Sequence, residues 1–248
     1  MRSELIQPAS DLPPGTRMQP AECETHGAYE QKVFSLLGKE LKSGCPECGR
    51  AIREKSEAIE LANKAMELRT AMERKLGAAL IPKRFAGKTL DGYVATTAEQ
   101  RKALNTCRRY AAEFSQISES GRCLLLLGKP GTGKTHLSVG IANEIMAKSS
   151  ATAVYRTIGS VLQAIRATYD RTNEQSESQI LSSLIGPSLL ILDEIGVSKE
   201  KPSDFELTTL FAIINGRYEE MRPTVIVSNL DGQSLPAAIG ERCIDRLR

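Results

Sequence analysis

Residues 123–135, CLLLLGKPGTGKT, decide the fold of this chain. An apolar run leads directly into the pattern Gly-x4-Gly-Lys-Thr, and an apolar-periodic stretch follows it. Glycines let successive backbone N–H groups point at phosphate oxygens, and the start of a helix adds its positive end. The context of strand, loop and helix therefore predicts a phosphate-binding loop for a nucleotide. Its residues are Gly128, Lys129, Pro130, Gly131, Thr132, Gly133, Lys134 and Thr135, with His136 beside them.

Two side chains of this loop have a predictable chemistry. Lys134 supplies a positive charge to the β- and γ-phosphates, and the Thr135 hydroxyl is the expected ligand of Mg²⁺. His136 follows them directly, and a position on the helix surface is the simpler interpretation of this histidine than a catalytic one. The loop thus predicts ATP and Mg²⁺ as cofactors.

The chain around this loop alternates between short apolar runs and helical patterns. Such alternation predicts an α/β fold with a parallel sheet covered on both faces. The expected strands are 123–127, 153–157, 189–192 and 224–228, and the expected helices between them are 135–148, 160–170, 177–184 and 204–221. A further helix is expected over 98–117, after an irregular lead-in at 81–93.

Polar residues end the third and fourth of these strands. Asp193 and Glu194 follow LLIL, at a strand end that lies beside the phosphate loop in parallel sheets. Asp193 would organise Mg²⁺, and Glu194 would orient or deprotonate an attacking water, which favours hydrolysis. Asn229 ends the fourth strand and could hold the same water. The alternatives are a helix cap for the two acids and a turn residue for the asparagine.

The first fifth of the chain carries a metal-ligand pattern, Cys23-x2-His26-x18-Cys45-x2-Cys48. Two pairs at x2 spacing make the Cys3His set that zinc prefers in closed structural sites. Unlinked residues or two disulfides are the alternatives, and a cytoplasmic location disfavours disulfides. The remaining cysteines are expected to be small buried hydrophobes: Cys107, Cys123 and Cys243.

These patterns divide the chain into four expected parts. Residues 1–20 read as a flexible tail, 21–49 as the zinc-binding unit, 50–78 as a helical linker and 79–248 as the nucleotide-binding domain. The linker is charged with a thin apolar stripe, which fits either a solvated connector or a partner-docking helix. The net charge is +3, and neither a secretory signal nor a long apolar segment is present, so we expect a cytoplasmic protein without membrane contact.

Several longer stretches resemble a known family. They are IPKRFAGKTLDGY, GKPGTGKTHL, LLILDEIGV, INGRYEEMRPTVIVSNL and LPAAIGERCIDRLR, which together span residues 81–248. With these elements the chain resembles the AAA+ ATPases, specifically the bacterial helicase loaders of the DnaC and DnaI type and the related IstB transposition helpers. A zinc-binding region before the ATPase domain is similar to that of the DnaI-type loaders.

The resemblance implies roles that the residues alone leave open. Asn229 corresponds to the sensor-1 position, and Arg246 to the arginine finger that reaches the γ-phosphate of a neighbouring subunit, with Arg242 as the second candidate. A charged helix end is the alternative for both arginines. Family members usually continue into a final strand, so we expect a sheet that lacks it and exposes an edge, because the sequence stops at Arg248.

The resemblance also implies a function. It is ATP-dependent loading of a hexameric replicative helicase onto single-stranded DNA, by a chain that forms an ATP-dependent homo-oligomer and contacts the helicase through its N-terminal region. An IstB-like transposition ATPase and a non-hydrolysing zinc-containing adaptor are the alternatives. Few basic residues point to DNA, and they are scattered near predicted loops: Lys129, Lys199, Lys201, Arg217 and Arg222.

Overall fold

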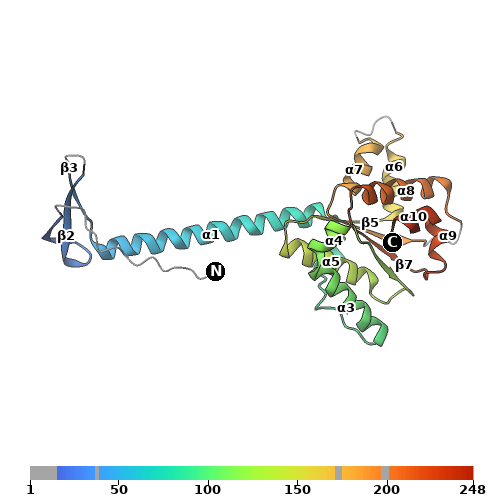
Figure 1. Cartoon of the computed structure of the whole chain (residues 1–248), viewed down its shortest axis with the longest axis horizontal. Coiled ribbons are helices and arrows are strands. Elements are labelled where there is room, and N and C mark those ends of the chain that lie inside the picture. The colour runs from blue at the N-terminus through green and yellow to red at the C-terminus, as the bar shows by residue number, and fades with distance from the viewer. Residues whose placement is uncertain (1–15, 37–38, 171–174, 197–200, 248) are drawn as a thin grey trace. The chain divides into compact units, whose positions relative to one another are not determined.

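The computed structural model describes residues 16–36, 39–170, 175–196 and 201–247. The chain separates into two compact units, an N-terminal unit up to Leu68 and a C-terminal unit from Arg69 onward. Figure 1 labels the elements of both units. Among the described residues, no helix is both long and apolar enough to cross a bilayer.

The N-terminal unit contains a small antiparallel sheet that the sequence patterns did not predict. Its strands are β1 (Arg17–Cys23), β2 (Gly27–Leu36) and β3 (Lys39–Lys42), in the order β1-β2-β3. β1 and β2 meet at a tight turn, where Cys23 pairs with Gly27. The tail expected over residues 1–20 must therefore be shortened, because residues 17–20 pair with β2.

Helix α1 (Pro46–Ala78) begins inside the second cysteine pair, four residues before the expected linker. Proline suits this first helical position, because its missing N–H would have no partner there. From residue 46 to Leu68 the helix buries none of its side chains. The large apolar side chains in that stretch are at least half exposed: Ile52, Ile59, Leu61, Met66 and Leu68.

The C-terminal unit is built on a four-stranded parallel sheet. Its strands are β4 (Leu124–Leu127), β5 (Ala153–Thr157), β6 (Leu189–Ile195) and β7 (Thr224–Ser228), in the order β4-β7-β6-β5. The predicted strands and their parallel pairing are confirmed. Within the described residues, β4 and β5 are the edges of this sheet.

Helices cover both faces of the sheet, as Figure 1 shows. One face packs against α3 (Ala98–Ala112), α4 (Phe114–Ser120) and α5 (Lys134–Lys148). The other packs against α6 (Ile158–Ala167), α7 (Glu177–Ile185), α8 (Asp204–Glu219), α9 (Leu235–Ile239) and α10 (Glu241–Arg246). Neighbouring side chains of β6 alternate between the two cores, which is the period of two that a strand imposes. Short helix α2 (Lys83–Ala86) lies in the lead-in that was expected to be irregular.

Two local features differ from the sequence prediction. The helix expected over 98–117 is divided at Glu113, which ends α3 and precedes α4. Arg217, considered above among the basic residues near predicted loops that could reach DNA, is 1% exposed. Its guanidinium donates hydrogen bonds to the carbonyls of Leu184, Ile185, Pro187 and Pro223 and to the Thr224 hydroxyl. Burial lowers its pKa to about 9.

Candidate nucleotide and metal sites

The phosphate loop joins β4 to α5 at the carboxyl edge of the sheet. Gly128, Gly131 and Gly133 all have positive φ angles, the region in which glycine is favoured over other residues. A Cβ on Gly133 would also lie 2.5 Å from Cε2 of Tyr93. Tyr93 itself donates its hydroxyl to the Thr132 carbonyl at 2.7 Å. The shape of the loop therefore favours glycine at these three positions, most strongly at Gly133.

Lys134 extends along the inside of this loop. Its Nζ donates to the carbonyls of Gly128 and Lys129, both at 2.8 Å, and to Oδ1 of Asn229 at 3.0 Å. Burial lowers the pKa of Lys134, while the negative charge of Asp193 acts in the opposite direction. The ammonium therefore lies between the loop that follows β4 and the residue that follows β7. It is within hydrogen-bond distance of three acceptor oxygens that phosphate oxygens could replace.

Asp193 is the buried acid of the site, 4% exposed. Its Oδ2 accepts hydrogen bonds from Oγ1 of Thr135 at 2.7 Å and from the hydroxyl of Tyr155 at 2.9 Å. Its Oδ1 accepts from the backbone N–H of Glu194 at 2.7 Å. Burial raises the pKa of Tyr155, so this phenol remains a donor. The carboxylate is surrounded by neutral donors, and no ion pair with Asp193 occurs within the described residues.

A cavity of about 430 Å³ brings the predicted catalytic residues of β6, β7 and the loop together. Its lining includes Lys134, Thr135, Asp193, Glu194 and Asn229. Glu194 is exposed and has φ of +60°, a conformation that is rare for a residue with a side chain. Such an outlier at the mouth of a polar cavity fits a functional constraint on this acid.

His136 contributes to this cavity from the first turn of α5. Its Nε2 lies 2.8 Å from the Thr89 carbonyl, and its ring meets that of Tyr93 edge-on with centroids 5.3 Å apart. Arg84 and Phe85, which no sequence pattern singled out, line the same cavity. The lead-in at the start of the domain therefore contributes to the lining of the nucleotide site.

The two candidate finger residues, Arg242 and Arg246, lie apart from the cavity around Asp193. They line a different cavity of about 490 Å³ together with Phe211, Glu241 and Asp245. Arg246 donates to Asp245 Oδ2 at 2.6 Å and to Asn215 Oδ1 at 3.2 Å, and its guanidinium lies 4.8 Å from the ring centroid of Tyr218. Within its own chain, Arg246 is thus held by three neighbours.

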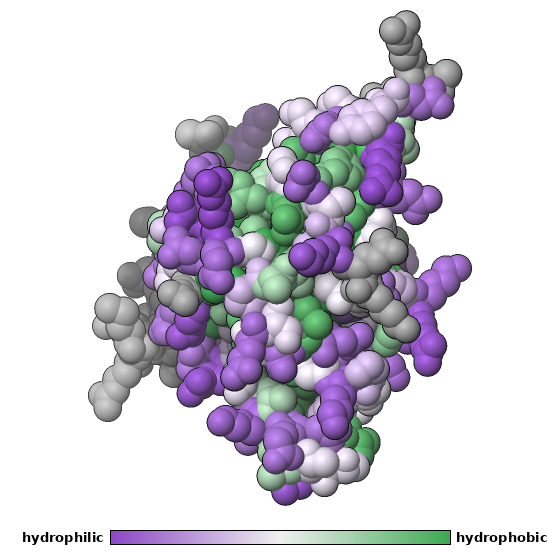
Figure 2. Space-filling view, turned by 90° about the vertical axis from the view of Figure 1, so that its right-hand side faces the viewer, coloured by the Kyte–Doolittle hydropathy of each residue, from purple (hydrophilic) through white to green (hydrophobic). Residues whose placement is uncertain are grey.

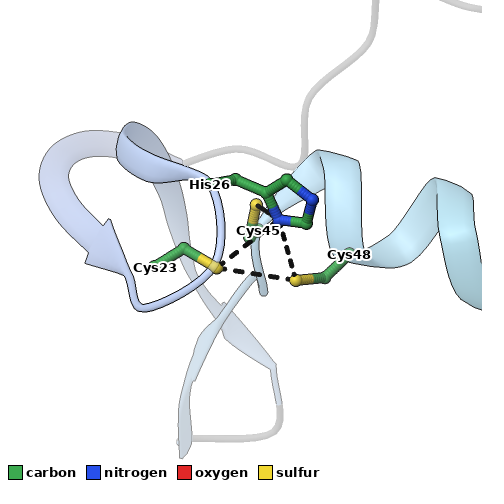
Figure 3. A group of neighbouring side chains, drawn as sticks. All are labelled: Cys23, His26, Cys45 and Cys48. Atoms are coloured by element: carbon green, nitrogen blue, oxygen red, sulfur yellow. Dashed lines mark hydrogen bonds between the residues drawn. The ribbon is translucent and has the colours of Figure 1, made fainter.

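The four metal-ligand candidates of the N-terminal unit converge, as Figure 3 shows. The sulfur atoms of Cys23, Cys45 and Cys48 and one ring nitrogen of His26 all lie within 4.8 Å of one another. Nδ1 of His26 is 3.7 Å from Sγ of Cys23, 3.8 Å from that of Cys45 and 3.3 Å from that of Cys48. In a tetrahedral zinc site with Zn–S bonds of about 2.3 Å and a Zn–N bond of about 2.0 Å, two sulfur atoms lie about 3.8 Å apart and each sulfur lies about 3.5 Å from the nitrogen.

The chemistry of these thiols also suits a metal. Hydrogen bonds from the Thr25 backbone and the His26 side chain lower the pKa of Cys23 to about 6. The hydrogen bond between Cys48 and Cys23 has the opposite effect on Cys48 and raises its pKa to about 11. A cation among them would favour the thiolate form of each. The donor set and its geometry therefore fit zinc.

The other cysteines are structural. Cys107 and Cys243 are 0% and 1% exposed, and burial raises their pKa values to about 12 and about 11. Cys123 is partly buried, and burial also raises its pKa. Neutral, poorly accessible thiols of this kind pack as small apolar groups.

The surface shows no continuous hydrophilic stripe on the face drawn in Figure 2, where hydrophilic side chains alternate with small apolar areas. Of the basic residues considered for DNA, Lys129 and Lys201 are exposed and Arg222 is partly exposed. The prediction that Arg217 contacts DNA is wrong, because this side chain is buried. Lys199 lies outside the described residues. The scattered arrangement gives little support to a DNA surface built from these side chains.

Comparison with known proteins gives matches over most of the chain. The model of the family described as IstB-like ATP binding protein matches residues 58–244. The chain is 33% identical over 211 residues to the replicative helicase loader DnaC of Escherichia coli K12, covering 85% of this chain and 80% of that protein. It is 34% identical over 196 residues to the DnaC of Buchnera aphidicola from Acyrthosiphon pisum, covering 79% and 76%.

Solved structures agree with these matches. The crystal structure of the DnaC helicase loader is similar with a TM-score of 0.59 and 25% identity, over 67% of this chain and 94% of that one. The DnaI structure, at 24% identity and a TM-score of 0.57, covers 68% and 90% and supports the fold. Together the relatives favour a loader over a transposition helper.

Proposed function

The chain belongs to the family of IstB-like ATP binding proteins, and from this membership we propose that it is an ATP-dependent loader of a hexameric replicative helicase in DNA replication. The ATPase part of the proposal is supported by one observation: residues at or just after the ends of β4, β6 and β7 meet at one cavity. Lys134 reaches Asn229, which directly follows β7, and Thr135 reaches Asp193 of β6. A helicase loader works where the DNA is replicated, so the proposal keeps the cytoplasmic location expected from the sequence.

The residues of this cavity would divide the work of ATP hydrolysis. The loop from Gly128 to Thr135 would hold the phosphates, with Lys134 exchanging its carbonyl partners for phosphate oxygens. Thr135 and Asp193 would hold Mg²⁺, which when bound neutralises charge on the phosphates. The Asp193 carboxylate suits this, since only neutral groups donate to it. Glu194 would orient the attacking water, and Asn229 would hold it near the γ-phosphate.

An ATPase assay with and without single-stranded DNA tests this division. The chain should hydrolyse ATP, and Glu194→Gln should bind ATP while hydrolysing it at least about 100-fold more slowly. Tight ATP binding without turnover by the unsubstituted chain would instead identify a zinc-containing adaptor with a nucleotide switch.

Arg246 would complete the site of a neighbouring subunit in an ATP-dependent oligomer. Its position supports this role, because it lines a cavity other than the one that contains Asp193. A cation supplied in trans would stabilise the charge on the transferring phosphoryl group.

Mixing two inactive variants tests the role in trans. Arg246→Ala keeps Glu194, and Glu194→Gln keeps the arginine, so a mixed oligomer contains some complete sites. We expect activity to appear on mixing, whereas Arg242→Ala should remain active alone. A mixture as inactive as its components would contradict the role of Arg246.

The N-terminal unit would capture the helicase. Ile52, Ile59 and Met66 are 66%, 52% and 70% exposed and recur every seven residues, so they lie along one side of α1. Exposed apolar side chains at this spacing support a partner-docking helix over a solvated connector. The zinc centre would hold the sheet at the start of this helix.

A loading assay on closed circles of single-stranded DNA tests the whole proposal. With ATP, the chain should increase the helicase bound per circle several-fold. Ile59→Asp should lose helicase capture but retain ATP binding, whereas Ala58→Asp, which adds the same charge about 100° around the helix, should keep capture. Equal capture by both variants would contradict docking on this stripe. Direct DNA contact by the loader would appear as salt-sensitive binding of the free strand.

A further inference from the structure

Tyr155 connects the candidate magnesium site to the second edge of the sheet. It lies on β5, is 6% exposed, and its ring belongs to the core cluster beneath α5. Its hydroxyl donates to Asp193 Oδ2, the same oxygen that accepts the hydrogen bond from Thr135. The tyrosine and the phosphate loop's threonine therefore hold the same oxygen of the proposed metal-holding acid.

The backbone of Tyr155 is fixed from both sides. On one side β5 pairs with β6, which places Tyr155 opposite Ile191. On the other side its N–H donates to the carbonyl of Ala79 at 2.8 Å, and Ala79 is fully buried immediately after α1. Two hydrogen-bonded neighbours and a packed ring leave the hydroxyl little freedom. Supports of this kind hold a functional group in its working orientation.

A buried phenol needs a hydrogen-bond partner, but that need alone does not require a carboxylate. Tyr110 shows the simpler solution in the same unit. It is also 6% exposed, and its hydroxyl donates to the backbone carbonyl of Arg122 at 2.9 Å. Burial of the Tyr155 phenol therefore does not by itself explain why its hydroxyl donates to the Asp193 carboxylate.

We propose that Tyr155 is a positioning residue that holds the Asp193 carboxylate facing the Thr135 hydroxyl, ready for Mg²⁺. The inference rests on the proposed ATPase function and extends it to a residue of a neighbouring strand. Without the phenol, the carboxylate loses one of three donors and can rotate away from Thr135. Partners of metal ligands typically contribute 10- to 100-fold to metal affinity, so we expect a loss of about that size.

Tyr155→Phe in the full chain tests this inference by metal affinity. Mn²⁺, a paramagnetic substitute for Mg²⁺, is titrated into the complex with a non-hydrolysable ATP analogue and followed by electron paramagnetic resonance. The Kd for Mn²⁺ should rise about 10- to 100-fold, while nucleotide affinity without added divalent metal stays unchanged. In the ATPase assay, the Mg²⁺ concentration for half-maximal rate should rise, and saturating Mg²⁺ should restore most of kcat.

Tyr110→Phe is the matched control, because it removes the same hydroxyl from an equally buried ring. We expect its unfolding temperature to fall about as far as that of Tyr155→Phe, whereas its Kd for Mn²⁺ should not change. Equal Mn²⁺ affinity in Tyr155→Phe and the unsubstituted chain, or an equal loss in both variants, would overturn the inference alone. If the unsubstituted chain binds neither nucleotide nor Mn²⁺ with it, the proposed function fails as well.

Discussion

The two units of this chain reach order by different means. In the described part of the N-terminal unit, two residues are buried, Val33 and Cys45. The C-terminal unit packs two apolar clusters against opposite faces of one sheet. An apolar core removes enough surface from water to hold a fold, whereas a sheet with almost no core needs a cross-link. In the N-terminal unit, a zinc ion held by the Cys/His cluster would supply that cross-link.

Removal of the metal should produce the largest difference between the units. Structural zinc contributes on the order of 10 kcal/mol to small domains of this kind. Cys45→Ser should therefore lose zinc and the protection of β1 to β3 against hydrogen exchange, while the C-terminal unit unfolds at the same temperature. Elemental analysis should find one zinc per unsubstituted chain and one in Cys123→Ser, which changes a cysteine outside the cluster. If reduced protein lacks zinc but β1 to β3 remain protected against hydrogen exchange, the metal is not what stabilises the N-terminal unit.

Arg217→Leu should destabilise the C-terminal unit alone. The substitution leaves four backbone carbonyls and a hydroxyl without their donor in a buried place. Each unmet buried acceptor costs about 1 kcal/mol or more, so we expect a loss of about 4 kcal/mol in urea unfolding. Zinc content should not change. Arg101→Leu, at an exposed position of α3, should cost under about 0.5 kcal/mol, and similar losses in both variants would contradict this account.

Lys134→Ala separates function from folding in the C-terminal unit. Loss of a charge-assisted contact with the phosphates should weaken ATP binding about 100-fold, or about 3 kcal/mol. The zinc centre should remain intact by metal analysis. Lys129→Ala should bind ATP nearly normally, because the loop uses its backbone at that position. A comparable loss in both lysine variants would show that overall charge, and not position, determines the affinity.

The smallest expected effect comes from one substitution made in both units. Val225 is fully buried in the central strand β7, and Val33 is 2% exposed in the small sheet. Val225→Ala should lower the free energy of unfolding in urea by about 2 kcal/mol, because the packed core cannot close around the cavity that the missing methyl groups leave. Val33→Ala should cost about 1 kcal/mol or less, measured by hydrogen exchange of β2 with zinc bound. A larger loss for Val33 would mean that apolar packing contributes more to this unit than its burial indicates.

The difference between the units also explains what the sequence could predict. Strands β4, β6 and β7 are apolar runs that lead into the phosphate loop or into polar residues, so pattern and chemistry placed Lys134, Thr135, Asp193 and Asn229 at one edge. Strands β1 to β3 are mostly exposed and carry no such signal. Pro20 argues against a central strand and is accommodated because β1 is an edge.

Two side chains escaped prediction for a different reason. Arg217 is charged, but its position between the end of α7 and the start of β7 depends on tertiary packing that no periodicity encodes. Tyr155 reads as an ordinary β-strand aromatic, and its hydroxyl gains a meaning only when β6 brings Asp193 beside it. Their roles come from contacts between distant parts of the chain.

The contacts of Arg246 have a consequence for assembly. In the proposed oligomer, Asp245, Asn215 and Tyr218 would compete with the neighbouring subunit for this guanidinium. The neighbour would have to displace them, so the measured affinity between subunits would be the intrinsic affinity reduced by the fraction of chains in which Arg246 is released. A nucleotide that offers a γ-phosphate to Arg246 would shift this exchange, and self-association and ATP occupancy would then be linked equilibria.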